Sequence, residues 1–177
     1  MILAARHPPP AIDSGICYGR LDVGLADPVP TGAERILAHI GATMPSRIVT
    51  SPLRRANSVA QYLATQLDVP LLVEPGLAEL DFGTWEGVGW RHIPLTEIDA
   101  WAADPLGYRP GGAMSVNDLY NRVKACLAEH APQADHQIWI THAGPLRCLA
   151  ALSRKMPLQS CLSKPFPYCG ILQINAP

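Results

Sequence analysis

Short apolar runs alternate with helical patterns along this chain, and this alternation limits the folds open to it. The strand-like runs cover residues 1–5, 47–50, 70–74, 138–141 and 171–174. The helical patterns lie near 33–43, over 54–67 and 115–130, and from about 145 to 155. Strands that alternate with helices build βαβ units around a mostly parallel sheet. We therefore expect an α/β fold, a three-layer α/β/α sandwich with helices on both faces of the sheet.

Length and composition favour one packed domain. The chain has 177 residues, of which 48% are hydrophobic and 16% charged. This balance is typical of a globular chain rather than a disordered one, so we expect a single domain over 1–177. The stretch 83–114 is rich in glycine and proline. We expect it to make excursions and a short helix over the sheet edge, as a cap above a substrate.

Charge and cysteine usage exclude several classes of partner. The formal net charge of -1 disfavours a nucleic-acid binder. We expect no membrane span, because no apolar run reaches the length of about 18 residues that one needs. The five cysteines form no CxxC pair, which is typical of a reduced, cytoplasmic protein. We expect no cofactor.

Two of the apolar runs end in a histidine. The first run leads into Arg6 and His7, and the run 138–141 leads into His142. In open α/β sheets, ligands bind beyond the carboxyl ends of the strands. If both runs are parallel strands of one sheet, the two imidazoles lie side by side with Arg6 next to them. The alternative is two unrelated histidines in the core.

A third run ends at Thr50 and leads into a helix that begins with two arginines. On a helical wheel, the apolar stripe of this helix is centred near Ala56. Arg54 then points about 160° away from the stripe, and Arg55 about 100° away, at the flank of the buried face. Arg55 is therefore the arginine expected to turn inward, although a tandem pair can also be two solvated side chains.

Together, Arg6, His7, Arg55 and His142 predict a phosphate site. Arginine forks match phosphate oxygens, and helix N-termini add partial positive charge. A neutral histidine can act as the nucleophile and form a phosphohistidine. The leaving oxygen needs an acid, for which Glu79 is a candidate because it lies between apolar neighbours. Asp81 and Glu86 lie close by, so spacing alone leaves the choice among the three open.

Five segments, in order along the chain, match a known pattern: Arg6-His7, Gly15–Asp22, Ser51–Ala56, Leu77–Gly87 and Thr141–Gly144. They resemble the signature motifs of the histidine phosphatase superfamily, the phosphoglycerate-mutase-like enzymes. Within it, the chain is most similar to the small branch that includes α-ribazole-5′-phosphate phosphatases.

The resemblance implies a role for each residue of the predicted site. It implies that His7 is the phosphorylated nucleophile and that Glu79 serves as acid and then as base. Arg6, Arg55 and His142 would bind the phosphoryl group. The implied reaction is hydrolysis of a small phosphomonoester without a metal ion.

The chain departs from the family pattern near the nucleophile. Pro8 replaces a glycine, which removes a backbone donor and fixes φ. Asp13 stands where a polar asparagine is expected, so Ser14 or a backbone amide is expected to bind phosphate instead. The turn 111–115 lacks the glutamate of the corresponding family motif.

Four alternative functions fit parts of this sequence. A phosphoglycerate-mutase-type phosphoryl transferase shares the machinery, and a non-catalytic phosphate-binding protein shares the site. Cys148 and Arg154 have the C-x5-R spacing of cysteine phosphatases, but without a glycine-rich phosphate loop. A metal hydrolase could use His7 and His142, although the neighbouring arginines would oppose a divalent cation.

The substrate side of the site has fewer signals. Tyr18, Trp85 and Trp90 could form an aromatic wall for a base such as dimethylbenzimidazole. Alternatively, these rings pack the cap against the sheet.

Overall fold

The computed structural model describes residues 1–41, 44–131 and 136–175. Within this part of the chain, five strands form one sheet in the order β3-β2-β4-β1-β5. They are β1 (Ile2–Arg6), β2 (Arg47–Thr50), β3 (Leu71–Val73), β4 (Gln137–Thr141) and β5 (Ile171–Ile174). All neighbouring pairs are parallel except β1 with β5, which is antiparallel. The predicted α/β fold with a mostly parallel sheet is confirmed.

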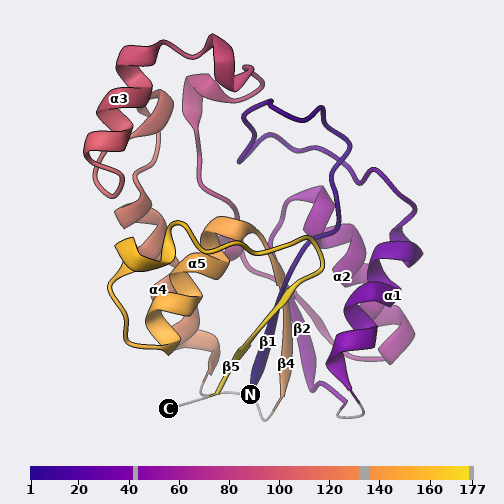
Figure 1. Ribbon diagram of the computed structural model, residues 1–177. Coiled ribbons are helices and arrows are strands. Elements are labelled where there is room, and N and C mark those ends of the chain that lie inside the picture. The colour runs from indigo at the N-terminus through magenta and orange to yellow at the C-terminus, as the bar shows by residue number, and fades with distance from the viewer. Residues whose placement is uncertain (42–43, 132–135, 176–177) are drawn as a thin grey trace.

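Helices cover both faces of this sheet (Figure 1). The helices are α1 (Val29–Ile40), α2 (Arg54–Leu67), α3 (Leu95–Ala103), α4 (Val116–His130) and α5 (Ala143–Ser153). Helices α1 and α2 contact each other on one face, and α4 and α5 contact each other on the other face. Among the described residues, no helix has the length and apolar character of a membrane span.

The strands feed two cores because successive side chains point to opposite faces. In β4, Ile138 and Ile140 pack with the α1–α2 layer, whereas Trp139 packs with the α4–α5 layer. These three side chains are fully buried. Both layers therefore hold β4 rigidly, and β4 carries His142 at its carboxyl end.

The helix limits follow local signals in the sequence. Helix α2 has the predicted limits, and α4 begins after Ser115, whose side chain forms a capping box with Asp118. Helix α1 begins at Val29, earlier than predicted, with Pro30 in its first turn. Proline is tolerated there because the first N–H groups of a helix have no partner within it.

The stretch 83–114 rises beyond the carboxyl edge of the sheet and carries α3 (Figure 1). Its core is a small cluster of Cys17, Trp85 and Ile93, against which Trp101 and Tyr108 pack. A bridge between Ile16 and Gly89 joins this stretch to the loop after β1. All five cysteines of the chain are buried and free.

Candidate active site

The sheet brings the two strand-end histidines together. Strands β1 and β4 are adjacent and parallel, with Arg6 opposite Thr141. The His7 amide donates to the Thr141 carbonyl at 2.9 Å. The ring centroids of His7 and His142 lie 5.0 Å apart, and both side chains are buried. The prediction that the two imidazoles lie side by side is confirmed.

The hydrogen bonds of His7 determine which ring nitrogen carries the proton. Nδ1 lies 2.6 Å from the carbonyl oxygen of Pro8, which can only accept, so Nδ1 carries the proton. Arg55 Nε can only donate, and it donates to His7 Nε2 at 3.3 Å. Nε2 therefore presents a lone pair. Pro8 lacks a backbone N–H, but its carbonyl orients the imidazole.

Burial keeps this imidazole neutral. Desolvation, and then the positive charge of Arg55, lower the pKa of His7 to about 3, although the hydrogen bond to Pro8 opposes the shift. Arg6 lowers this pKa further. At neutral pH the ring is therefore uncharged, which is the form that a nucleophile requires.

Arg55 turns inward from the first turn of α2, and Arg54 beside it is exposed, as the helical wheel predicts. The Arg55 side chain is fully buried. Its guanidinium donates to the carbonyls of Gly19 at 2.6 Å and Leu21 at 2.9 Å. These two bonds fix the guanidinium plane while Nε faces His7.

The loop that holds Arg55 is itself held by one carboxylate. Glu86 accepts backbone N–H bonds from Gly19, Arg20 and Leu21, at 2.6 to 3.0 Å. Glu86 therefore acts on the site through the loop 19–21 rather than as an acid. The sequence analysis named Glu86 only as a candidate acid, because its partners lie more than 60 residues away.

His142 is positioned by Ser51, which follows β2. A hydrogen bond of 2.7 Å joins His142 Nε2 and Ser51 Oγ, and both residues are fully buried. Burial, the neighbouring His7 and the positive charge of Arg55 hold the pKa of His142 well below its usual range. The sequence analysis included Ser51 in a motif but gave it no role.

Arg6 is held by the segment before β5. Its guanidinium donates to the Phe166 carbonyl at 2.7 Å and lies 3.9 Å from the ring centroid of Tyr168. The Tyr168 and Tyr18 hydroxyls are 3.0 Å apart. Tyr168 was not among the predicted site residues. It lies far from Arg6 along the chain, so no local sequence pattern indicates their contact.

Glu79 lies where α5 begins. Its carboxylate accepts from the Leu80 amide at 2.9 Å and from the Gly144 amide at 3.2 Å. A Cβ on residue 144 would push the Glu79 carboxylate out of this position, because it would collide with Oε1. The two amides therefore orient the Glu79 carboxylate beside the strand that leads to His142.

Arg6, His7 and Glu79 line one cavity of about 450 Å³. Its remaining walls are mostly apolar or aromatic. They include Ile16, Tyr18, Phe82, Trp90, Trp101, Pro105, Val116, Leu119, Leu158 and Leu162. The stretch 83–114 contributes three of these residues. The cavity thus combines an anion-binding end with an apolar wall, in the size range of small-molecule sites.

The structure does not bring every predicted residue to this cavity. Ser14 is exposed and does not line it. Arg55 and His142 do not line it either, and they contact His7 instead. Trp85 is buried against Trp101 inside the stretch 83–114 and does not line the cavity.

Comparison with known proteins identifies the family. The model of the histidine phosphatase superfamily (branch 1) matches residues 2–176. This chain belongs to the histidine phosphatase superfamily.

Several relatives have phosphatase names, and one is named a probable phosphoglycerate mutase. A glucosyl-3-phosphoglycerate phosphatase of Mycobacterium tuberculosis is 28% identical over 153 residues, which cover 79% of this chain and 68% of that protein. Phosphoserine phosphatase 1 of Hydrogenobacter thermophilus is 24% identical over 140 residues, which cover 76% of this chain and 66% of that protein.

Solved structures have the same fold. The α-ribazole phosphatase of Shigella flexneri superposes with a TM-score of 0.80 and 20% identity, covering 90% of this chain and 82% of that one. The names of the relatives and neighbours therefore span several substrates, and phosphatases are common among them.

Proposed function

We propose that this protein is a phosphomonoesterase that hydrolyses a small phosphorylated metabolite through a phosphohistidine on His7. The observation that carries the proposal is the hydrogen bonding of His7. The proton-bearing Nδ1 donates to the Pro8 carbonyl, so the lone pair of Nε2 faces the Arg55 guanidinium. His7 also lines the cavity, where a substrate phosphate can reach it.

In the first step, His7 Nε2 attacks phosphorus and the bond from phosphorus to the ester oxygen breaks. Glu79 gives a proton to the leaving oxygen, which departs as an alcohol. The Arg55 N–H that now donates to Nε2 then donates to a phosphoryl oxygen, since Nε2 no longer has a lone pair. Arg6 binds a second oxygen from the cavity side.

In the second step, Glu79 takes a proton from a water molecule that attacks phosphorus. The bond from phosphorus to Nε2 breaks, and inorganic phosphate leaves. Glu79 therefore returns to its acid form, and His7 to its neutral form. His142 faces the same phosphoryl group from the neighbouring strand. Arginines and histidines supply the stabilisation throughout, so we expect no need for a metal ion.

The cavity walls support a substrate whose alcohol portion is apolar or aromatic. Tyr18, Trp90 and Trp101 face the same space as the anion-binding end, and 83–114 acts as the cap. α-Ribazole 5′-phosphate, which carries an aromatic base, is our candidate substrate. Mutase-type transfer to phosphoglycerate is the alternative, for which Arg147 in the cavity wall would face the polar acceptor.

Turnover of p-nitrophenyl phosphate in the presence of EDTA tests the proposed reaction. We expect phosphate release by the wild type and a loss of at least about a thousandfold in His7→Ala, since the nucleophile is absent. His39→Ala is the matched control, because His39 is exposed on α1. Full activity of His7→Ala would overturn the assignment of the nucleophile, and no turnover by the wild type would favour a binding protein.

A substrate panel tests the proposed specificity. α-Ribazole 5′-phosphate, phosphoserine and 3-phosphoglycerate are compared by kcat/KM. We expect the substrate with the aromatic base to lead, and Trp101→Ala to lower its kcat/KM more than that of phosphoserine. Equal kcat/KM values across the panel would contradict the role given to the aromatic wall.

A further inference from the structure

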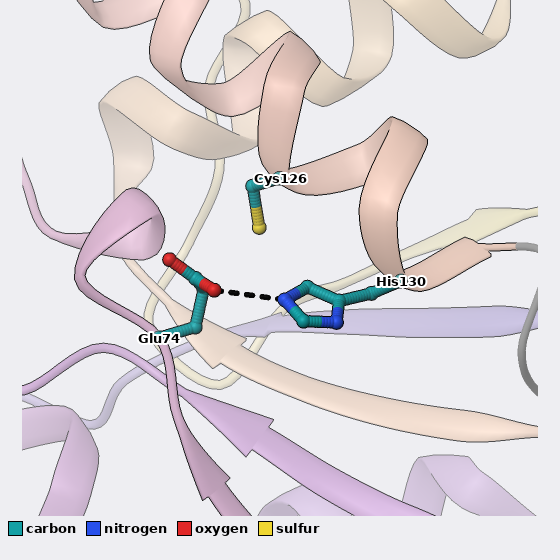
Figure 2. A group of neighbouring side chains, drawn as sticks. All are labelled: Glu74, Cys126 and His130. Carbon is teal, nitrogen blue, oxygen red and sulfur yellow. Dashed lines mark hydrogen bonds and ion pairs between the residues drawn. The ribbon is translucent and has the colours of Figure 1, made fainter.

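Away from the cavity, three side chains of metal-binding type converge between β3 and α4 (Figure 2). Glu74 directly follows β3, whereas Cys126 and His130 are four residues apart on α4 and share one face of that helix. One possible ligand atom from each lies within 4.8 Å of the others. Glu74 Oε2 and His130 Nε2 are 2.8 Å apart. None of the three residues lines the cavity.

The three side chains are shielded from water to different degrees. Cys126 and His130 are buried, with 3% and 5% exposure, and the Glu74 side chain retains 18%. An ion can therefore enter past Glu74, and a water molecule can complete its coordination there. The second ring nitrogen of His130, Nδ1, has no hydrogen-bond partner among the described residues, and the ring packs edge-on against Trp139.

The charges around the thiol are negative on balance. Glu74 and Glu129 face it, opposed by Arg122. A divalent cation between these side chains would balance the two carboxylates.

We propose that Glu74, Cys126 and His130 form a zinc site that fastens α4 to the end of β3. A sulfur, a nitrogen and an oxygen ligand are the set that Zn²⁺ uses, whereas Mg²⁺ and Ca²⁺ prefer oxygen alone. With metal–ligand bonds of about 2.0–2.3 Å, the ligand atoms of a tetrahedral site lie roughly 3.3–3.8 Å apart. Cys126 Sγ therefore needs to approach the other two atoms, whereas Glu74 Oε2 and His130 Nε2, now 2.8 Å apart, need to separate slightly. On binding, the Cys126 S–H proton passes to solvent and the proton of the neutral His130 ring moves from Nε2 to Nδ1. The hydrogen bond between Glu74 and His130 then gives way to two bonds to the ion.

The site would brace the segment that leads to Glu79. Arg122, also on α4, donates to the carbonyls of Pro75 at 2.9 Å and Ala78 at 2.8 Å. A zinc ion at Glu74 would add a second tie between α4 and this segment. Its effect therefore falls on stability, while turnover per folded molecule stays as it is in the metal-free protein.

Titration of EDTA-dialysed protein with Co²⁺ tests the site directly. We expect equimolar binding with a sulfur-to-cobalt charge-transfer band, displacement by Zn²⁺, and a rise in Tm of several degrees with Zn²⁺. Cys126→Ser and Glu74→Gln should lose the band and the rise. Cys161→Ser, at a cysteine buried in the same core, is the matched control and should keep both.

Three results would overturn this proposal. They are the absence of a cobalt band in the wild type, a band that survives in Cys126→Ser, and a band lost in His7→Ala, which would place the ion in the cavity. If Cys126→Ser fails to fold, Glu74→Gln decides in its place. Turnover of p-nitrophenyl phosphate by the same samples reports separately on the proposed phosphatase, so failure of one proposal is distinguishable from failure of the other.

Discussion

At the scale of single residues, the site depends on which atoms can only donate and which can only accept. The Pro8 carbonyl and the Arg55 guanidinium leave His7 no choice of tautomer. The helical periodicity of the sequence correctly selected Arg55 over Arg54. It could not predict the carbonyls of Gly19 and Leu21, because they come from a loop without periodicity.

Glu86→Gln tests the indirect hold on Arg55. The amide group would face backbone N–H donors, and each donor left without a partner costs about 1–3 kcal/mol. We expect kcat to fall by about tenfold or more, with a smaller change in KM, because the loop 19–21 would no longer fix Arg55 beside His7.

Asp81→Asn is the matched control, since the Asp81 carboxylate accepts from the nearby Gly83 amide and does not hold the loop 19–21. It should leave kcat within about threefold of the wild type. A Glu86→Gln enzyme with unchanged kcat would show that the loop does not position Arg55.

Acid stability tests the neutral state of His7. Its pKa is near 3 in the folded protein and about 6.5 in the unfolded chain, so the unfolded state binds more protons between these values. The free energy of unfolding should therefore decrease as the pH falls from 6.5 towards 3. Urea midpoints at pH 7 and pH 5 measure this decrease.

His7→Asn should reduce this pH dependence only in part, because the pKa of His142 is also lowered in the folded protein. His39→Asn, on the surface, should not alter it. Equal pH dependence in the wild type and in His7→Asn would contradict a buried, neutral His7.

At the scale of elements, the limits of a helix or strand were predicted most accurately where a periodic apolar pattern repeats. Helix α2 has the predicted limits because its apolar stripe runs over its whole length. Strand β3 is shorter than predicted, because Glu74 leaves the strand to accept from the Gly76 amide. Helix α1 begins early because Pro30 suits a first turn. Side-chain contacts between distant loops left no such pattern.

The approach of α1 to the loop after β1 explains how the chain accommodates Pro8. A Cβ on Gly32, in the first turns of α1, would lie 2.8 Å from Pro8 Cβ and closer still to Pro8 Cγ. These ring atoms belong to a stiff side chain that cannot turn away. The absence of a side chain at position 32 therefore makes room for the proline that follows His7.

Gly32→Ala tests this contact. In an open helix the substitution gains about 1 kcal/mol, but here we expect a loss of about 1–3 kcal/mol in unfolding free energy and a lower kcat. Pro8→Gly in the same chain should restore stability, and a double-mutant cycle measures the coupling. Additive effects of the two substitutions would contradict a direct contact.

At the scale of the whole molecule, the sheet separates two regions with different tasks. The carboxyl ends of β1, β2 and β4 hold the imidazoles and the serine and arginine that position them. The second region is formed by Glu74, at the end of β3, and by Cys126 and His130 on α4. We assign a role in stability to this region. The stretch 83–114 contributes Trp90 and Trp101 to the cavity of the first region.

The phosphorylated residue is the most direct test of the account. Wild-type protein is mixed with a phosphomonoester and quenched in alkali, which preserves phosphohistidine, before proteolysis and mass spectrometry. Cleavage after Arg6 and Arg20 gives a peptide in which His7 is the only histidine. We predict phosphate on this peptide, and none in His7→Ala. Phosphate on the peptide that carries His142, or turnover without any phosphopeptide, would contradict the account.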